Sequence, residues 1–202
     1  MVEKLRSLLS LPSAYSLFWR LIGGPSRSMI VVKEYVRLRP EDRVLEIGCG
    51  PGTIVPYLAA AEYVGFDASL EYIQAARAKF GDFATFVCER VSEYSLRQLS
   101  YFDVVLALGI VHHLDDAEAS QLFQIAHSAL KPGGRLITLD GCFTEGQSAF
   151  ARYLLTKDRG QYVRSREGYL RIASEVFTDI KASIRPDLLH VPYTHLILEC
   201  TR

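Results

Sequence analysis

The chain has 202 residues, 49% of them hydrophobic, and its Lys plus Arg and Asp plus Glu balance at 23 each. This length suits one domain with a single sizeable core. The hydrophobic content, with charges interspersed along the chain, excludes a disordered polymer, and the zero net charge argues against nucleic acid as a bulk partner.

The first 40 residues precede the first predicted strand and are rich in Tyr, Trp and Leu. A leucine-rich run at 8–11 follows two basic residues, as in a secretory signal, but Pro12 breaks it early and no small-residue cleavage pattern follows. No stretch reaches the roughly 20 apolar residues of a membrane span. We expect this segment to form helices that act as a lid over the ligand-binding site predicted from the following residues. Tyr15 is a candidate substrate contact there, with an ordinary core aromatic as the alternative.

The most informative stretch is residues 44–53, where a short apolar strand, predicted near 43–47, runs into a turn with three glycines. Glycine at this density after a buried strand suits a backbone that adopts unusual dihedrals and brings its amides close to a ligand. The turn therefore predicts a nucleotide-type site built from Gly48, Cys49, Gly50 and Gly52.

Two acids narrow the choice of nucleotide. Glu46 ends a hydrophobic strand, where a carboxylate is costly without a partner; the ammonium group of S-adenosylmethionine (SAM), or the loop amides, would provide one. Asp67 ends a second predicted strand, about 20 residues after the glycines, the separation at which an acid reaches a ribose hydroxyl. The spacing of Asp67 from the glycines would also allow an NAD-dependent oxidoreductase. The glycine spacing, Gly-x-Gly-x-Gly, differs however from the Gly-x-Gly-x-x-Gly pattern of dinucleotide-binding folds.

From residue 43 onward, short β-rich runs alternate with longer helical ones, which is the pattern of a parallel sheet with helices on both faces. A helix over 70–80 begins after a cap at 67–69. Another begins at Asp115 or Asp116 and ends at Leu130, where Pro132 and two glycines turn the chain. Strands are predicted near 43–47, 62–66, 83–87, 102–108, 134–140, 178–185 and 192–201, and further helices over 145–156 and 165–176.

Four motifs in order resemble the class I SAM-dependent methyltransferases of small-molecule type. They are Val44 to Gly52, Asp67, the segment 102–114 and the segment 130–137. The resemblance implies an α/β, Rossmann-like fold: a doubly wound seven-stranded sheet, mostly parallel, with an antiparallel last strand and helices on both faces. It would form one domain over 1–202, with a helical lid at 1–40, a cofactor-binding core at 41–141, and acceptor-side helices with the final strand pair at 142–202.

The resemblance also implies SAM as the cofactor and assigns further binding positions. Ala68 would lie beside the ribose-binding acid. Glu89 and Arg90 follow the third strand, where the family meets the adenine edge; a solvated charged pair is the alternative. Leu108 and Gly109 end the fourth strand, where a backbone carbonyl would meet the methionine ammonium.

Two candidate catalytic residues, His112 and His113, follow that strand. A histidine there has a pKa near the operating pH and could take a proton from an acceptor hydroxyl or amine. We favour His113, because the second position matches where some small-molecule methyltransferases place a base. A structural or cofactor-cradling role stays open, since His-His-Leu is widespread in the family whatever the substrate.

Charged and aromatic residues gather in two C-terminal runs, residues 157–164 and 185–195. If these turns face the sulfonium, they form an acceptor pocket in which an arginine could pair with a carboxylate or phosphate. The candidates are Arg159, Arg164, Tyr193 and His195. A solvated loop and a plain edge strand are the alternative.

The four cysteines are far apart and form neither a Cys-x-x-Cys pair nor a metal-binding spacing with histidine. We expect free thiols in a cytoplasmic protein that binds no metal. The few insertions in the core leave little chain for a macromolecule-binding surface. The sequence predicts a SAM-dependent enzyme that methylates an oxygen or nitrogen of a small molecule, with a non-catalytic SAM-binding subunit as the main alternative; it does not predict the oligomeric state.

Overall fold

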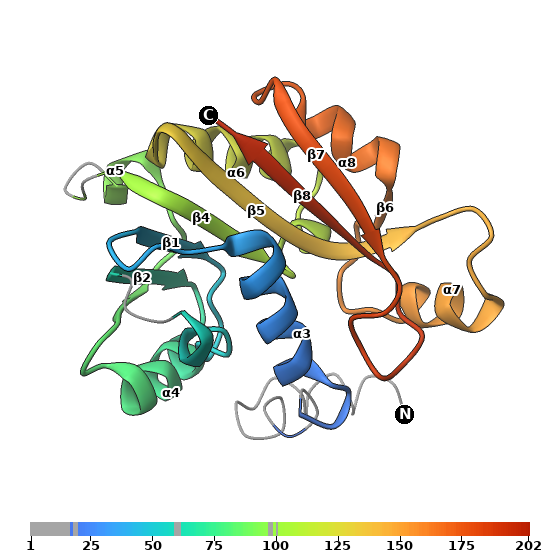
Figure 1. Cartoon of the computed structure of the whole chain (residues 1–202), viewed down its shortest axis with the longest axis horizontal. Coiled ribbons are helices and arrows are strands. Elements are labelled where there is room, and N and C mark those ends of the chain that lie inside the picture. The colour runs from blue at the N-terminus through green and yellow to red at the C-terminus, as the bar shows by residue number, and fades with distance from the viewer. Residues whose placement is uncertain (1–16, 18–19, 59–61, 97–98, 100) are drawn as a thin grey trace.

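A central sheet organises the computed structural model, which describes residues 17, 20–58, 62–96, 99 and 101–202. Its strands run in the order β3-β2-β1-β4-β5-β8-β7, and a short strand, β6, pairs with β5 (Figure 1). The described strands are β1 (Arg43–Ile47), β2 (Glu62–Asp67), β3 (Thr85–Cys88), β4 (Phe102–Leu108), β5 (Leu130–Phe143), β6 (Arg164–Ser165), β7 (Asp179–Arg185) and β8 (His195–Thr201).

The helices follow the alternation expected from the sequence. The described helical segments are α3 (Gly24–Val31), η1 (Val32–Val36), η2 (Val55–Tyr57), α4 (Leu70–Phe80), α5 (Glu93–Leu96), η3 (Val111–His113), α6 (Asp116–Ala129), α7 (Ala149–Thr156) and α8 (Arg166–Ala173). Within residues 1–40, α3 and η1 are helical as predicted, and their role as a lid stays a prediction; Tyr15 lies outside the described residues. None of the helices in the described part of the chain has the length and apolar character needed to span a bilayer.

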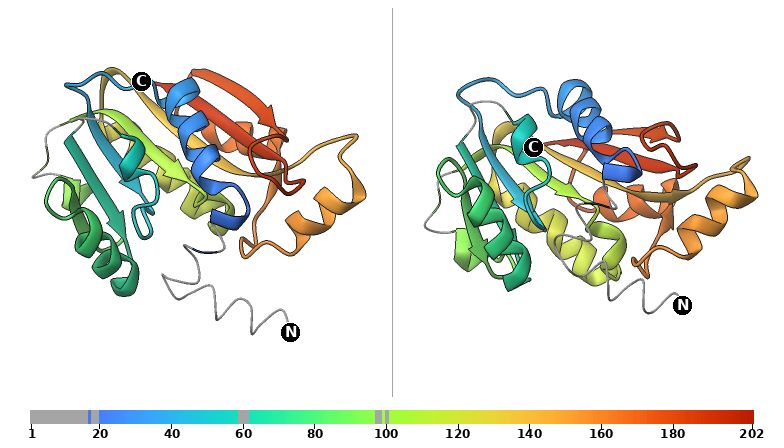
Figure 2. Two further views of the ribbon diagram at one scale, coloured as in Figure 1. Left: turned by 60° about the horizontal axis from the view of Figure 1, so that its bottom comes forward. Right: turned by 90° about the horizontal axis from the view of Figure 1, so that it is seen from below.

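Side chains of β1 and β4 alternate between two hydrophobic cores, one on each face of the sheet. Val44 and Val104 pack with residues of α3, η1 and α4, whereas their neighbours Leu45 and Val105 pack with residues of α6 and α8. Successive strand residues point to opposite faces, so a strand buried on both sides is mainly apolar. Figure 2 shows α3 and α6 on opposite faces of the sheet. The doubly wound arrangement predicted from the sequence is confirmed.

Local capping explains where two helices begin. The Ser69 side chain accepts a hydrogen bond from the Tyr72 amide and starts α4. Asp115 and Glu118 form a capping box at the start of α6, so Asp115 is the cap of the two aspartates considered. Each cap satisfies backbone donors that a first helical turn leaves unpaired.

The Pro-Gly-Gly segment differs from the predicted simple turn. Helix α6 ends at Ala129, and Leu130 is already extended and pairs with Phe102. The register then shifts, so that Val104 pairs with Arg135, and the extra residues form an irregularity within β5. Pro132 has no amide hydrogen for a ladder bond, and Gly133 takes a positive φ of 76°, which together account for the local break in pairing.

The antiparallel strand predicted at the C-terminus is β8. It inserts between β5 and β7 and runs antiparallel to both. The two-residue β6 was not predicted, because it pairs only through Cys142 and Phe143 at the far end of β5. With β6, the sheet has eight strands rather than seven. The order of strands in the sheet thus brings the ends of β1, β2 and β4 together at one edge, where the candidate site lies.

Candidate functional site

A cavity of about 170 Å³ opens where β1, β2 and β4 end. It also receives residues of α3 and of the loop after α7, so segments far apart in sequence meet there. Of the sequence-predicted site residues, the following line the cavity: Glu46, Gly48, Cys49, Gly50, Asp67, Leu108, Gly109, His113 and Arg159. In open α/β sheets, ligands bind beyond the carboxyl ends of the strands, which is the location of this cavity.

The glycine turn shapes one wall of the cavity. The amides of Gly48 and Cys49 both donate to the Phe66 carbonyl, at 2.8 and 3.0 Å. Gly48 has a φ of 74°, and a Cβ there would lie 2.9 Å from Ile110 Cδ1. A side chain would therefore be strained and would also push against Ile110, just beyond the end of β4. Gly52 has a different role, because it packs against Phe80 and does not line the cavity.

Glu46 is the buried acid of the site. Its side chain accepts a hydrogen bond of 2.5 Å from the Tyr63 hydroxyl. Burial raises the pKa of Glu46 to about 8; the Tyr63 hydrogen bond opposes this shift, and the nearby Asp67 adds to it. At neutral pH Glu46 is therefore mostly protonated, and a cation placed beside it would favour ionisation.

Tyr63 was missed by the sequence analysis, which treated residues 62–66 only as a strand. In the parallel pairing of β1 with β2, Val44 lies opposite Tyr63 and Glu46 lies opposite Gly65. Tyr63 is therefore two positions before the residue opposite Glu46 and points to the same face of the sheet. A buried tyrosine generally finds a partner for its hydroxyl. The tyrosine in a strand next to one that carries a buried acid was the available signal.

Asp67 joins the end of β2 to the glycine turn. Its Oδ2 accepts from the Gly50 amide at 2.9 Å and its Oδ1 accepts from the Ser69 amide at 2.8 Å. Each carboxylate oxygen can accept a further hydrogen bond, so a sugar hydroxyl could still be held. Asp67 thus fixes the turn and faces the cavity at the same time.

Three other predicted cofactor contacts lie outside the cavity lining. Ala68 and Glu89 are exposed, and Arg90 reaches across to Glu118 of α6 at 3.4 Å. That pair fits the alternative of a solvated charge at the strand end, and an adenine-binding role for Glu89 and Arg90 stays a prediction.

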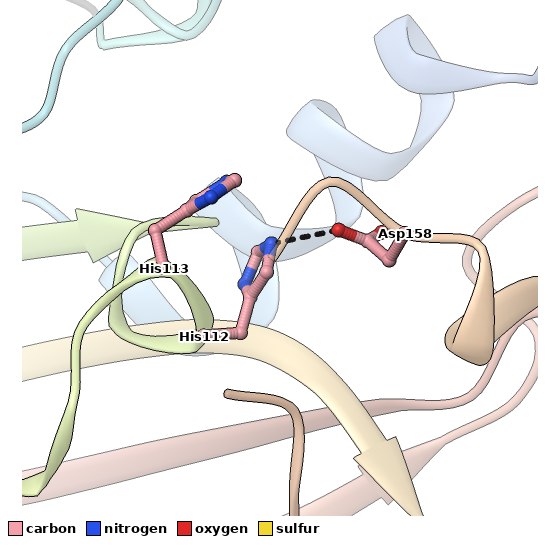
Figure 3. A group of neighbouring side chains, drawn as sticks. All are labelled: His112, His113 and Asp158. Carbon is pink, nitrogen blue, oxygen red and sulfur yellow. Dashed lines mark ion pairs between the residues drawn. The ribbon is translucent and has the colours of Figure 1, made fainter. Parts of the chain in front are cut away.

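His112 is a buried histidine held between two carboxylates. Its Nδ1 lies 2.7 Å from Asp140 Oδ1. Its Nε2 lies 3.2 Å from Asp158 Oδ1 on the other side of the ring (Figure 3). Burial opposes protonation, but the hydrogen bonds to both aspartates outweigh it and raise the pKa of His112 to about 9. Burial acts against ionisation of Asp158 too, yet the His112 hydrogen bond keeps the pKa of Asp158 well below its usual range. An imidazolium paired in this way cannot accept another proton.

His113 is exposed and lines the cavity, with its ring 4.4 Å from the His112 ring between centroids. Partial desolvation and the neighbouring His112 cation lower the pKa of His113 to about 4. His113 is therefore neutral at pH 7 and can accept a proton. This separation of roles favours His113 over His112 as the base.

His112, His113 and Asp158 also place their ligand atoms within 4.8 Å of one another. Such a group can hold a metal ion, although the sequence analysis expected none. A metal ligand must be deprotonated. Any metal ion here would have to displace the proton that His112 shares with Asp158.

The predicted acceptor residues separate into two groups. Arg159 lines the cavity, and the Tyr193 hydroxyl donates to Asp158 Oδ2 at 2.7 Å. Arg164 instead binds the carbonyls of Val111 and Leu114 and does not line the cavity. His195 is buried in β8, where burial, together with nearby positive charges, lowers its pKa to about 3. Asp158 was missed, because the charged run was searched only for cations.

Comparisons with known proteins give the following matches. Residues 44–134 match the family model described as "Methyltransferase domain". The chain is 28% identical over 162 residues to phosphoethanolamine N-methyltransferase 1 of Arabidopsis thaliana, covering 76% of this chain and 32% of that protein. The chain thus spans about a third of the length of this relative.

Two solved structures share the fold. The pyocyanin biosynthetic protein PhzM superposes with a TM-score of 0.73 at 14% identity, over 99% of this chain and 61% of that one. Magnesium protoporphyrin IX methyltransferase of Synechocystis, solved with bound S-adenosylhomocysteine (SAH), has a TM-score of 0.66 at 23% identity, over 89% and 83%. These likenesses confirm the fold predicted from the sequence.

Proposed function

We propose, from the match of residues 44–134 to the methyltransferase-domain family model, that the protein transfers a methyl group from SAM to an oxygen or nitrogen of a small acceptor. The supporting observation is the convergence of Glu46, the glycine turn and Asp67 around one cavity. These groups match the three chemical parts of the cofactor's amino-acid and sugar portions: an ammonium, a carboxylate and a ribose.

The residues present fit SAM as the cofactor. Glu46 is a buried carboxyl group that a cationic ammonium would ionise, and Asp67 can accept from a ribose hydroxyl. Gly109, with a φ of 76°, lets the backbone at the end of β4 approach a ligand without a clashing side chain. When bound, SAM supplies an activated methyl group, so the protein contributes mainly orientation and exclusion of water.

His113 and Arg159 would serve the acceptor. Neutral His113 would take the proton that an amine or hydroxyl loses as it is methylated. Arg159 would bind an anionic group of the acceptor, such as a phosphate or carboxylate. The name of the relative that acts on phosphoethanolamine fits an acceptor of this kind. His112 would act through its neighbours rather than by taking a proton.

The other candidate functions rest on weaker observations. A Tyr-x-x-x-Lys spacing, such as some oxidoreductases use, does occur at Tyr153 and Lys157, but neither residue lines the cavity. A SAM-binding subunit without activity has the same cofactor residues as an enzyme. Incubation of the protein with labelled SAM and with phosphoethanolamine, related amines or hydroxyl compounds distinguishes the two alternatives. Transfer of the label to an acceptor shows an enzyme, and no transfer to any of them indicates a subunit that only binds SAM.

A thermal-shift comparison tests the cofactor. We expect SAM or SAH to raise the melting temperature and NAD to leave it unchanged, because ligand binding to the folded state stabilises it by mass action. With ligand at about 100 times its dissociation constant, the gain is roughly 2.7 kcal/mol. Stabilisation by NAD and none by SAH would show that the cofactor is wrongly chosen.

Replacing His113 with glutamine tests the base. We expect kcat to fall roughly tenfold at saturating SAM, less than the usual 10²–10⁴-fold for general bases, since a group of such low basicity is a weak acceptor. SAH affinity should stay within about twofold in this variant, since His113 is assigned to the acceptor. An unchanged kcat would exclude His113 as the base.

We also propose a cytoplasmic location and an acceptor other than nucleic acid. Cys49, Cys88, Cys142 and Cys200 are all free thiols, as is usual for proteins of a reducing compartment. The balanced charge of the chain lacks the positive field that attracts nucleic acid.

A further inference from the structure

Residues 158–164, here called the strap, dock on the turn that carries both histidines. Alternate strap residues make the contacts: Asp158 and Gly160 meet the His112 side chain, and Tyr162 and Arg164 meet the backbone of η3 and its flanks. The strap therefore lies along η3 and is held to it by these contacts.

The first half of the strap closes over the His112 ring. Asp158 Oδ1 pairs with His112 Nε2 at 3.2 Å and accepts from the Gly160 amide at 2.8 Å, while Oδ2 accepts from Tyr193 at 2.7 Å. Gly160 packs so closely that a Cβ there would lie 1.9 Å from His112 Cδ2. Only glycine permits this approach. On its other side, His112 is held by Asp140.

The second half of the strap is fixed through the backbone. The Tyr162 amide donates to the His112 carbonyl at 2.9 Å. Arg164 donates to the carbonyls of Val111 and Leu114 at 3.2 and 2.8 Å and pairs with Asp116. Charge-assisted hydrogen bonds of this kind are stronger than neutral ones and define geometry. Both ends of the strap are thus tied to η3.

Arg159 lies between the anchored Asp158 and Gly160 and lines the cavity beside His113. We propose that Asp158 is a positioning residue: by clasping His112 it seats the strap and holds Arg159 at the cavity that His113 also lines, so that acceptor anion and base stand at a set separation. This inference rests on the proposed function for the roles of Arg159 and His113. The clasp itself is a property of the structure and can be tested without turnover.

The clasp is tested with Asp158→Asn, which keeps the side-chain shape and removes the charge. Trypsin cleaves after Lys157 and Arg159, and such cleavage follows local opening of the chain. We expect cleavage at these sites to become about tenfold faster in the variant, and Asp187→Asn to match the wild type. Asp187 is a suitable control because it is likewise an aspartate in an ion pair, with Arg185, but it is exposed and lies outside the strap.

If Asp158→Asn fails to fold, Tyr193→Phe replaces it, because that change removes only the hydroxyl that donates to Asp158. The same direction of effect is expected, at about threefold, because a single hydrogen bond is lost. Cleavage at the wild-type rate in a folded variant would overturn the clasp.

Positioning is tested in protein saturated with SAH, with phosphoethanolamine and inorganic phosphate as the probes. We expect Asp158→Asn to weaken binding of both probes about tenfold, while SAH affinity stays unchanged; with an active acceptor, KM rises and kcat changes less. If Asp158→Asn also weakens SAH binding, the variant has lost structure generally, and the positioning role is overturned. Unchanged binding of the two probes overturns it as well. Wild-type protein that binds SAH but neither probe also overturns it. Failure to bind SAH at all contradicts the proposed function instead, and the trypsin result still decides the clasp.

Discussion

Asp67→Ala is expected to weaken SAH binding about 100-fold, equivalent to roughly 2.7 kcal/mol. Two effects combine in this loss. The ribose loses a charged acceptor, and hydrogen bonds to charged groups contribute about 1.5–3 kcal/mol. The Gly50 amide also loses its partner, since Asp67 Oδ2 accepts from it at 2.9 Å, so the glycine turn is no longer held in its binding conformation.

Isothermal titration calorimetry with SAH measures this change. Asp82→Asn is a matched control, because Asp82 is an exposed acid in the turn after α4 and does not line the cavity. The control should bind SAH like the wild type. If Asp67→Ala also bound with wild-type affinity, Asp67 would have no place in the cofactor site.

Glu46→Gln is expected to weaken SAH binding about 100-fold at pH 7.5 and to remove its dependence on pH. A buried carboxylate that loses its charge opposite a cationic ligand costs roughly 2–5 kcal/mol of affinity. Glutamine keeps the shape, and its side-chain oxygen can still accept from Tyr63, so the change isolates the charge.

The pH dependence follows from the raised pKa of Glu46, about 8 in the folded protein. Only the ionised form attracts the ammonium of the ligand, so wild-type affinity should rise about tenfold or more between pH 6 and pH 7.5. Above about pH 8 the ligand amine itself loses its proton and the gain ends. Affinity that is flat across this range in the wild type would contradict the assignment of Glu46.

Tyr63→Phe gives a further check on direction. The Tyr63 hydrogen bond lowers the pKa of Glu46, so its removal should move the rise in affinity to higher pH.

The ligand-free protein should show the linked effect of the raised Glu46 pKa on stability. A carboxyl group whose folded pKa is raised stabilises fully below its unfolded value of 4.5, and this contribution is lost as the pH rises to about 8. Glu46→Gln should remove that part of the pH dependence.

Much of the fold could be predicted because its signals are local. The apolar runs of β1 and β4 and the helix caps at Ser69 and Asp115 depend on neighbours in the sequence. The irregular start of β5 was missed, since the pairing of Leu130 with Phe102 joins segments 28 positions apart. The spacing of glycines and acids picked out several residues that line the cavity for the same local reason, as each residue sits at or just beyond a strand end.

The acceptor side shows the opposite case. Asp158 and Tyr193 are 35 positions apart and hydrogen-bond to each other, and Asp158 also pairs with His112, which is distant from both in the sequence. No periodicity reports such contacts, so Arg164 and His195 were as plausible as Arg159 before the fold was known.

The sequence by itself predicted the resemblance to methyltransferases, the alternation of strands and helices, and the placement of Glu46, Gly48, Gly50 and Asp67 at the strand ends that line the cavity, because these depend on local patterns that short segments carry alone. Only the tertiary structure decided that His112 is a paired cation and His113 a neutral group, and that Arg159 reaches the cavity. Those properties depend on burial and on charges brought together across the fold, and neighbouring residues of the same type can differ completely in both.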